Sequence, residues 1–504
     1  MKFIDNFLNS ITMYRLLIYG LGVLIIISII LSWFGLLPFT PLELLISAGT
    51  LLVVCNVVNF GIGKLYKAPL NIESASITAL ILALVLAPAA SFSDYLIIIA
   101  AGIIAMLSKY VLAIHKKHIF NPAAITAVII GLGGSGLASW WVSSSPLLLF
   151  VLFFGLLVVR KIRRFSLFGT FLLVSLILLV IPRLFNGQPL VEIISEVFYS
   201  WPLIFLGTIM LTEPITTPPS RQLQIMYAMI VGCFFSLQFN VGSLYSTPEL
   251  ALVIGNIFAY IVSPKTKHRL SLISNQRLSN DIYEFIFKAA EKISFKPGQY
   301  FEWTLPKLFL EGRGNRRYFT IASSPTEENI RLGVRIFPKG SRFKQELINM
   351  KSGDEIWASQ LTGDFILPEN KQTKLLCIAG GIGITPFRSM IKYLVDRHEQ
   401  RDIVLLYACW SADSFVYQDI FAEAEKVVGL KVLYIISDLK NIPSGWQGKS
   451  GFIDEKLLQD CVPDYKQRMY YLSGPNSMVE TYVKLLTSIG IKRKAIKKDY
   501  FPGY

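Results

Sequence analysis

The chain is too apolar for an ordinary water-soluble protein. It has 504 residues, of which 53% are hydrophobic and 16% charged, with a mean hydropathy of +0.51 and a net charge of +15. Basic clusters in membrane proteins usually set topology and meet anionic lipid headgroups, and no basic-aromatic motif points to nucleic acid instead. Charged residues are sparse before about residue 264 and dense after it. We therefore expect a membrane half followed by a soluble half, with the lipid bilayer and not nucleic acid as partner.

Metal-based electron carriers are not favoured by the ligand residues of this sequence. The five cysteines form no CxxC pair, which argues against an iron–sulfur cluster held by one chain. A site that Cys55 or Cys233 shares with a partner subunit stays open. The four histidines lie outside the apolar spans, so two stacked bis-histidine haems inside the membrane are excluded. The sequence predicts no metal ligands.

The first half predicts an all-α bundle of about ten membrane-spanning helices. Segments apolar enough to cross about 30 Å of hydrocarbon lie at 15–37, 41–63, 74–91, 94–113, 122–139, 146–161, 166–182, 197–213, 222–240 and 248–263. Alternate loops are basic: they hold Lys64, Lys67, Lys116, Lys117, Arg160, Lys161, Arg163, Arg164, Arg221, Lys265, Lys267 and Arg269. The other loops hold Arg183 alone. This bias follows the positive-inside rule and predicts a multi-pass protein of the cell (inner) membrane with both termini in the cytoplasm.

Two segments of the membrane half suggest an inverted repeat. Residues 78–91 (TALILALVLAPAAS) and 206–218 (LGTIMLTEPITTP) each run apolar and then break at a proline, and a span that begins with proline follows each. Broken helices at corresponding positions of two halves are typical of a binding site at the repeat interface. Glu213, beside Pro214, is either a functional intramembrane acid or a residue at a helix boundary.

The segments HIFNPAAITAVI (118–129) and TIMLTEPITTPPS (208–220) resemble the NqrB/RnfD family, the membrane subunit of sodium-pumping NADH:quinone reductase and of the Rnf complex. The resemblance covers most of 1–264. That family carries FMN esterified to a threonine on the outer side, and Ser145 stands at the matching place, although the Asp, Gly and Ala of the family motif are missing. The resemblance makes Ser145 the candidate site of a membrane flavin; the alternative is a polar outer loop anchored by Trp140 and Trp141.

After a basic linker, the pattern changes to that of a soluble α and β protein. Short segments that alternate or run β-branched and aromatic predict a small antiparallel β-barrel over 265–370. From 371 to 504, strand patterns alternate with helix patterns, which is typical of a parallel, doubly wound α/β sheet. The glycine cluster GGIGITP (380–386) ends one of these strands and opens a helix, an arrangement that suits phosphate binding.

Four motifs occur in the order and spacing of the ferredoxin–NADP⁺ reductase family. They are RYFTIASSP (317–325), GGIGITP (380–386), YLSGPNSM (471–478) and DYFPGY (499–504). The chain from about 265 to 504 resembles that family, which implies an FAD-binding barrel and an NAD(P)-binding α/β domain. The resemblance further implies that FAD receives hydride from NAD(P)H.

The resemblance implies a set of FAD-binding residues: Arg317, Tyr318, Thr320, Gly340, Ser341 and Phe501. Arg317 offers a fixed fork to the pyrophosphate, and Tyr318 stacks on the isoalloxazine. Gly340 and Ser341 open a helix whose amides and hydroxyl suit phosphate. Phe501 covers the flavin as a movable lid that nicotinamide displaces.

The resemblance also implies the nucleotide site and the catalytic residues. The NAD(P)H-binding set is Gly380, Gly381, Gly383, Thr385, Pro386, Gly474 and Pro475. The catalytic set is Ser473, where the family usually has cysteine beside the nicotinamide, with Asp499 and Thr320 near the flavin N5 edge. Asp413, where an arginine would grip a 2′-phosphate, slightly favours NADH.

Taken together, the two halves predict a membrane-bound, FAD-dependent NAD(P)H oxidoreductase. FAD is expected to take hydride in the cytoplasm and pass electrons to the membrane half, where FMN, quinone or an outer-face acceptor receives them. Two alternatives remain: a redox-driven Na⁺ or H⁺ pump, and a transporter with an NADH-sensing flavin domain. A redox partner protein and a homo-oligomer are also compatible with the sequence.

Overall fold

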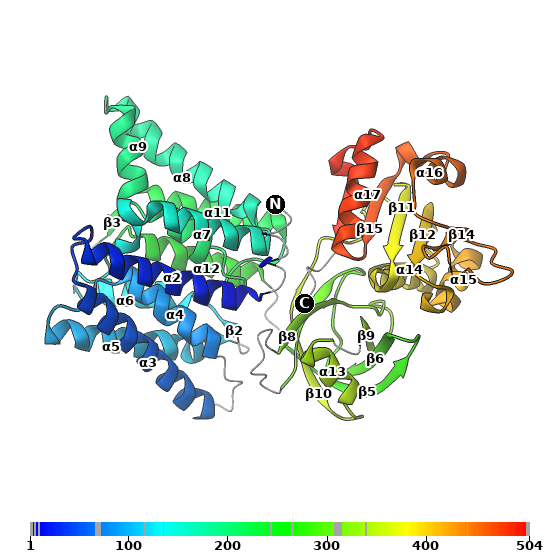
Figure 1. Ribbon diagram of the computed structural model, residues 1–504, viewed down its shortest axis with the longest axis horizontal. Helices are drawn as coiled ribbons and strands as arrows, with labels where there is room; N and C mark the ends of the chain where they lie inside the picture. Colours follow the sequence, from blue (N-terminus) through cyan, green and yellow to red (C-terminus); the bar gives the residue numbers. More distant parts are fainter. Residues whose placement is uncertain are drawn as a thin grey trace. The chain divides into compact units, whose positions relative to one another are not determined.

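The chain folds as two units that divide between Lys267 and His268. The computed structural model describes residue 4 and residues 7–8, 11–65, 72–114, 117–134, 136–241, 244–263, 267–306, 315–337, 340–440 and 442–499. The first unit is helical, whereas the second contains two six-stranded sheets (Figure 1).

The first unit is a bundle of helices that are apolar on most of their surface. They are α2 (Met13–Trp33), α3 (Pro41–Leu65), α4 (Ile72–Val85), α5 (Phe92–Val111), α6 (Pro122–Leu132), α7 (Leu148–Ile162), α8 (Phe165–Phe185), α9 (Leu190–Tyr199), α10 (Leu203–Phe205), η3 (Leu206–Met210), α11 (Arg221–Ser236) and α12 (Pro248–Val262). Large apolar side chains also face outward: Val53 is 63% exposed, Phe153 66% and Leu173 60%. A helix that is apolar all round requires an apolar environment on both sides.

The expectation of about ten membrane spans is wrong. In the part of the chain that the structure describes, five helices have the length and composition to cross a membrane: α2, α3, α5, α8 and residues Ser145–Ile162. The segments Leu190–Tyr199 and Leu203–Met210 form a sixth only if they count as one span bent by 57°. Other apolar segments give short helices. The 11 residues of α6 extend only about 17 Å, because the helix ends at Leu132, before a glycine-rich stretch in which Gly134 and Gly136 have positive φ.

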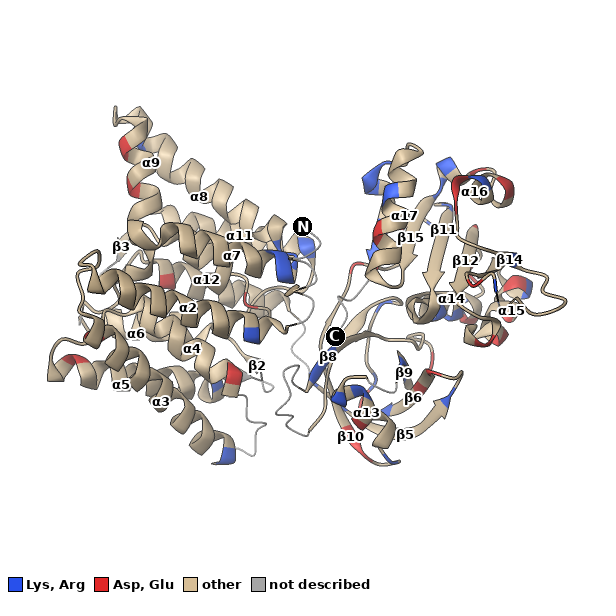
Figure 2. Cartoon of the chain, in the orientation of Figure 1, with Lys and Arg blue, Asp and Glu red and all other residues tan. Residues whose placement is uncertain are grey.

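Charged residues in the first unit lie mainly at helix ends (Figure 2). Lys64 lies in the last turn of α3, Arg160 and Lys161 lie in the last turn of α7, and Arg221 begins α11. Glu43 and Asp94 lie in the first turns of α3 and α5, at the ends opposite the basic residues of those helices. The middle of each long helix is therefore left almost without charge.

The first sheet of the second unit is antiparallel. Its strands are β5 (His268–Arg277), β6 (Ile282–Ala289), β7 (Tyr300–Thr304), β8 (Arg316–Thr320), β9 (Ile330–Arg335) and β10 (Glu355–Thr362), in the order β8-β7-β10-β5-β6-β9. The expected barrel is not confirmed, because β8 and β9 share no ladder in the described ranges. Beyond the five residues of β8, one backbone–backbone hydrogen bond among the described residues, from Ala322 N to Arg331 O (2.9 Å), links the two edges.

The second sheet is parallel, as predicted. Its strands are β11 (Leu375–Gly380), β12 (Ile403–Cys409), β13 (Lys431–Ile436), β14 (Lys449–Ser450), β15 (Met469–Ser473) and β16 (Ile496–Asp499), in the order β14-β13-β12-β11-β15-β16. One core contains α14 (Thr385–Asp396) and α15 (Gln418–Val427), and another contains α16 (Glu455–Cys461) and α17 (Asn476–Ser488). Strands buried on both faces read as continuous apolar runs, which is the pattern of β11 and β12.

Candidate functional site

The three residues predicted as catalytic come together in the second unit. Ser473 ends β15 and pairs in register with Asp499 on β16. Thr320, the last residue of β8 in the other sheet, donates a hydrogen bond from Oγ1 to Asp499 Oδ2 at 3.4 Å. All three side chains are buried. The carboxyl edge of the parallel sheet thus meets the edge of the antiparallel sheet at a small polar cluster.

Asp499 has an unusual proton affinity. Burial raises the pKa of its carboxyl from 3.8 to about 7, against the opposing effect of the hydrogen bond from Thr320. The side chain can therefore hold or release a proton near neutral pH, which is the range that suits a group taking part in acid–base chemistry.

The glycine-rich loop packs tightly against the loop that follows β15. A Cβ at Gly383 would lie 2.4 Å from Ser473 O and 2.6 Å from Gly474 Cα. Gly381, with φ of +52°, adopts a left-handed conformation that disfavours other residues. Both loops lie at the carboxyl ends of parallel strands, where open α/β sheets bind ligands.

The glycine-rich loop continues directly into α14. Thr385 and Pro386 form the first turn of the helix, and no described side chain caps it. The Thr385 hydroxyl donates to Ile382 O at 3.2 Å, and the Thr385 amide donates to the same oxygen, so both bonds hold the loop against the helix. Gly380 and Pro475 approach each other behind this loop, because a Cβ at Gly380 would lie 3.3 Å from Pro475 Cδ.

A group of cations surrounds the start of α13 (Arg342–Asn349). Arg317 is 3% exposed and donates to Arg316 O, and Lys344 Nζ donates to Arg335 O at 2.8 Å. Burial, then the charges of Arg317 and Arg335, lowers the pKa of Lys344 to about 8. A bound anion would relieve this repulsion.

The hydroxyl of Ser341 fits the same anion. Ser341 precedes α13 but does not cap it, and its Oγ is buried with no hydrogen-bond partner among the described atoms. Gly340 fits less well, because its amide already donates to Phe337 O at 2.8 Å. Arg317, Ser341 and Lys344 therefore form a site that suits the pyrophosphate of a dinucleotide.

Tyr318 lies on β8 opposite Glu302 of β7. Its hydroxyl donates to Glu302 Oε2 at 2.9 Å, and its ring makes an edge contact with Tyr300. This bond fixes the ring on the sheet. Neither Glu302 nor Lys344 was predicted. A charged residue at an inward-facing strand position could have drawn attention to Glu302, but its pairing with Tyr318 depends on the strand register, which the sequence does not show.

Phe501, the predicted lid, lies outside the described residues. Ser145 is exposed at the start of a short turn before α7. The adjacent Trp140 and Trp141 are not an interfacial anchor, since both are buried. Trp140 Nε1 donates to Glu249 Oε2 at 2.8 Å, and Trp141 Nε1 donates to Leu86 O at 2.9 Å.

Glu213 connects two helix breaks in the first unit. Its Oε2 accepts hydrogen bonds from Asn121 Nδ2 at 2.9 Å and Thr216 Oγ1 at 3.0 Å, and its Oε1 lies 3.7 Å from His118 Nε2. Asn121 also caps α6, which begins at Pro122. Glu213 lines a cavity of about 40 Å³ whose wall is otherwise apolar except for Tyr14, Ser74, Thr78, Asn121 and Thr212.

Comparison with known proteins points to electron transfer. Residues 377–484 match the family model described as an oxidoreductase NAD-binding domain. The glycine betaine monooxygenase reductase subunit of Pseudomonas aeruginosa is 26% identical over 224 residues, covering 44% of this chain and 60% of that protein. The aromatic O-demethylase reductase subunit of Amycolatopsis is 28% identical over 230 residues, covering 44% and 66%. The family match and these relatives support the predicted FAD- and NAD(P)H-binding oxidoreductase module of the second unit.

Solved structures give similar coverage. The cytochrome P450 reductase GcoB of Amycolatopsis has a TM-score of 0.42 at 25% identity, over 47% of this chain and 69% of that one. The cytochrome b5 reductase domain of Ulva prolifera nitrate reductase has a TM-score of 0.41 at 21% identity, over 47% and 98%. The chain spans about 60% of the length of the first curated relative. The resemblance of 1–264 to the NqrB/RnfD family stays a prediction.

Replacing Asp499 by asparagine should remove a pH dependence of stability. Between about pH 4 and pH 7 the folded wild type keeps a proton that the unfolded chain has released. Its free energy of unfolding therefore falls as pH rises, by up to about 4 kcal/mol across the interval. Thermal unfolding of the full chain in detergent should show the wild type losing stability relative to Asp499→Asn over this interval. Parallel curves for the two proteins would contradict the assignment.

Replacing Lys344 by methionine should weaken FAD binding by about 1.5–3 kcal/mol, the size of a hydrogen bond to a charged group. Lys494→Met is the matched control, because Lys494 is an exposed lysine in another part of the second unit. Equilibrium dialysis of the purified proteins against FAD measures the difference. Equal affinity in the two variants would remove Lys344 from the phosphate site.

Proposed function

We propose that the chain is a membrane-bound NAD(P)H oxidoreductase whose second unit holds FAD and NAD(P)H. The observation that carries this proposal is the meeting of Thr320, Ser473 and Asp499 beside the glycine-rich loop. Bound FAD would supply the chemistry of accepting a hydride and releasing electrons one at a time.

Each residue group of the second unit has a separate role in this proposal. Arg317, Ser341 and Lys344 hold the FAD pyrophosphate, and Tyr318 is held by Glu302 so that its ring orients the flavin. The glycine-rich loop and the first turn of α14 admit the nicotinamide dinucleotide. The Asp499 carboxyl, whose Oδ2 accepts a hydrogen bond from the Thr320 hydroxyl, holds or releases a proton. Phe501 remains a proposed lid.

NADH is the proposed donor in preference to NADPH. The strand β12 ends at Cys409, and the turn that follows, Ala412–Ser414, carries the exposed Asp413. A carboxylate at the end of this strand suits the two hydroxyls of a free ribose. The same charge would repel a 2′-phosphate.

The first unit is proposed to lie in the bilayer of the cell (inner) membrane, with both termini in the cytoplasm. Its long helices carry exposed apolar side chains along their length and charges at their ends. The basic end is placed in the cytoplasm by the positive-inside rule, on the side where the second unit would meet NADH. Both termini lie on one side only when the number of spans is even, so this assignment takes Leu190–Tyr199 and Leu203–Met210 as one bent span, the sixth.

The acceptor is proposed to be a quinone that enters the first unit from the bilayer. The cavity beside Glu213 has a mainly apolar wall, which suits the ring of a quinone, and its volume of about 40 Å³ must widen to admit that ring. Quinone reduction requires protons as well as electrons, and the carboxyl of Glu213 can transfer the protons.

A second flavin, FMN attached to the exposed Ser145, is the proposed intermediate carrier between FAD and the acceptor. Flavin fluorescence of the protein band on a denaturing gel would detect this FMN, and Ser145→Ala would abolish the fluorescence.

One observation favours a second candidate function, a redox-driven cation pump. The Glu213 carboxylate and the Thr216 hydroxyl place oxygen atoms together inside an apolar unit, and hard cations bind through oxygen ligands. Sodium-dependent turnover in sealed vesicles would distinguish the pump from a simple quinone reductase.

Glu213→Gln should separate the two half-reactions. In the wild type, anaerobic NADH should bleach the flavin absorbance, and added quinone should restore it. In the variant the bleaching should be unchanged, whereas reoxidation by quinone should slow about 100-fold to 10,000-fold, the usual effect of losing a proton-transfer group. Glu249→Gln is the control, because Glu249 is a buried carboxylate that accepts a hydrogen bond from Trp140 and does not line the cavity.

Wild-type protein whose flavin absorbance NADH does not bleach would contradict the proposed function. Equal reoxidation in both variants would contradict the quinone site.

A further inference from the structure

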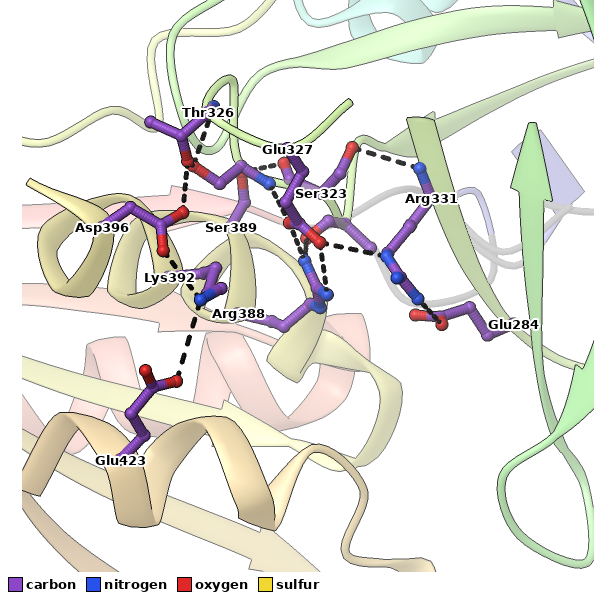
Figure 3. A network of polar contacts seen from close by, with 12 residues as sticks. Glu284, Ser323, Thr326, Glu327, Arg331, Arg388, Ser389, Lys392, Asp396 and Glu423 are labelled. Carbon is purple, nitrogen blue, oxygen red and sulfur yellow. Dashed lines mark hydrogen bonds and ion pairs between the residues drawn. The ribbon is translucent and has the colours of Figure 1, made fainter. Parts of the chain in front are cut away.

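A buried ion pair joins α14, the helix after the glycine-rich loop, to residues 322–327, the loop after β8. Arg388 lies on α14 and is 3% exposed. Its two terminal nitrogens bind the two oxygens of Glu327, with NH2 to Oε1 at 2.9 Å, and NH1 also donates to Ala322 O at 2.9 Å. Figure 3 shows Arg388 reaching from its helix to Glu327. A bidentate contact of this kind fixes orientation as well as distance.

Glu327 is itself held on the side of the antiparallel sheet. Its carboxylate accepts hydrogen bonds from Ser324 N at 2.6 Å and Arg331 Nε at 3.0 Å. Arg331 continues the chain of contacts to Glu284 on β6, at 2.6 Å (Figure 3). Burial alone would raise the pKa of Glu327, but hydrogen bonding to Arg388 and the charge of that arginine hold it below its usual range. The pair is therefore ionised at neutral pH.

A second contact acts beside the ion pair. Ser389 donates from Oγ to Ser323 O at 2.6 Å, and the Ser323 hydroxyl accepts from Arg331 N at 3.1 Å. Two consecutive residues of α14 thus hold one short loop, residues 322–327. That loop follows directly after Thr320, and α14 follows directly after Gly383.

Two short segments connect these contacts to the two regions predicted to bind the ligands. One is the end of a strand leading back to Thr320 and Arg317; the other is the first turn of a helix leading back to the glycine-rich loop. Arg388, Glu327, Ser323 and Ser389 therefore link the end of β8 to the glycine-rich loop, and Gly333 on β9 packs against Ile382 and Thr385 beside them.

We propose that Arg388 and Glu327 are positioning residues for hydride transfer: their ion pair sets the distance between the flavin held at Tyr318 and Thr320 and the nicotinamide held at Gly383. This inference rests on the proposed function of the second unit. Neither side chain contacts the reacting atoms. Because a misplacement of about 1 Å costs about 100-fold in rate, loosening the pair should slow the reaction without preventing either ligand from binding.

Arg388→Lys tests the proposal, because lysine keeps the charge but loses the planar fork. The matched control is Arg468→Lys. Arg468 is also buried and binds Asp464 through two nitrogens, at 2.7 and 3.0 Å, but it lies beside the amino ends of β11 and β15, away from the glycine-rich loop. Both variants lose a buried guanidinium–carboxylate pair, so both should lose thermal stability.

Anaerobic stopped-flow reduction of the FAD-loaded, full-length protein by NADH separates their effects. Arg388→Lys should lower the limiting rate constant at saturating NADH about tenfold or more, with FAD content and the NADH dissociation constant changed by less than about twofold. The deuterium isotope effect with NADH labelled at the transferred position should change in this variant alone. Arg468→Lys should keep the wild-type rate constant and isotope effect.

The rate constants of FAD reduction distinguish failure of the positioning role from failure of the proposed function. An Arg388→Lys rate constant equal to that of Arg468→Lys would overturn the positioning role while leaving the proposed function intact. A wild type that NADH does not reduce would overturn both. Should Arg388→Lys fail to fold, Glu327→Gln and Ser389→Ala carry the same comparison: slower reduction with intact FAD and NADH binding supports the proposal, and an unchanged rate in both overturns it.

Discussion

The ion pair between Arg388 and Glu327 joins the two sheets of the second unit. The candidate site needs both sheets, because the residues that suit a flavin lie on the antiparallel sheet and those that suit a nicotinamide lie on the parallel one. Neither sheet contains the whole site. Thr320 comes from one, Ser473 and Asp499 come from the other, and their cluster exists only while the two edges meet.

Buried charges are a costly way to join two sheets. Removing a guanidinium and a carboxylate from water is expensive, and apolar residues of similar volume often stabilise a protein better. Their use here is consistent with a need for a fixed geometry more than for stability. Arg388 is satisfied by Glu327 and by the Ala322 carbonyl, and Glu327 by Ser324 and Arg331, so the pair has one favourable arrangement.

Local motifs made part of the site predictable. The glycine-rich loop, Ser473 and Asp499 stand in short segments whose residue types indicate their environment, and the parallel sheet follows from alternating strand and helix patterns. The Arg388–Glu327 pair and the position of Lys344 beside Arg317 were not predictable, because they depend on tertiary contacts between distant segments. The number of spans was wrong for a different reason. Hydropathy measures apolar length, whereas the glycines after Leu132 end α6 within a segment that hydropathy predicts as one span.

The central claim is that the two sheets hold a flavin and a nicotinamide between them. A density map of the full-length protein, purified with FAD and NAD⁺ and determined in detergent or lipid, tests it most directly. We expect the isoalloxazine between Tyr318 and Ser473, with its pyrophosphate at Ser341 and Lys344 and the nicotinamide against Gly383. A map in which saturating FAD leaves these residues without density, or in which the flavin lies elsewhere, would contradict the account.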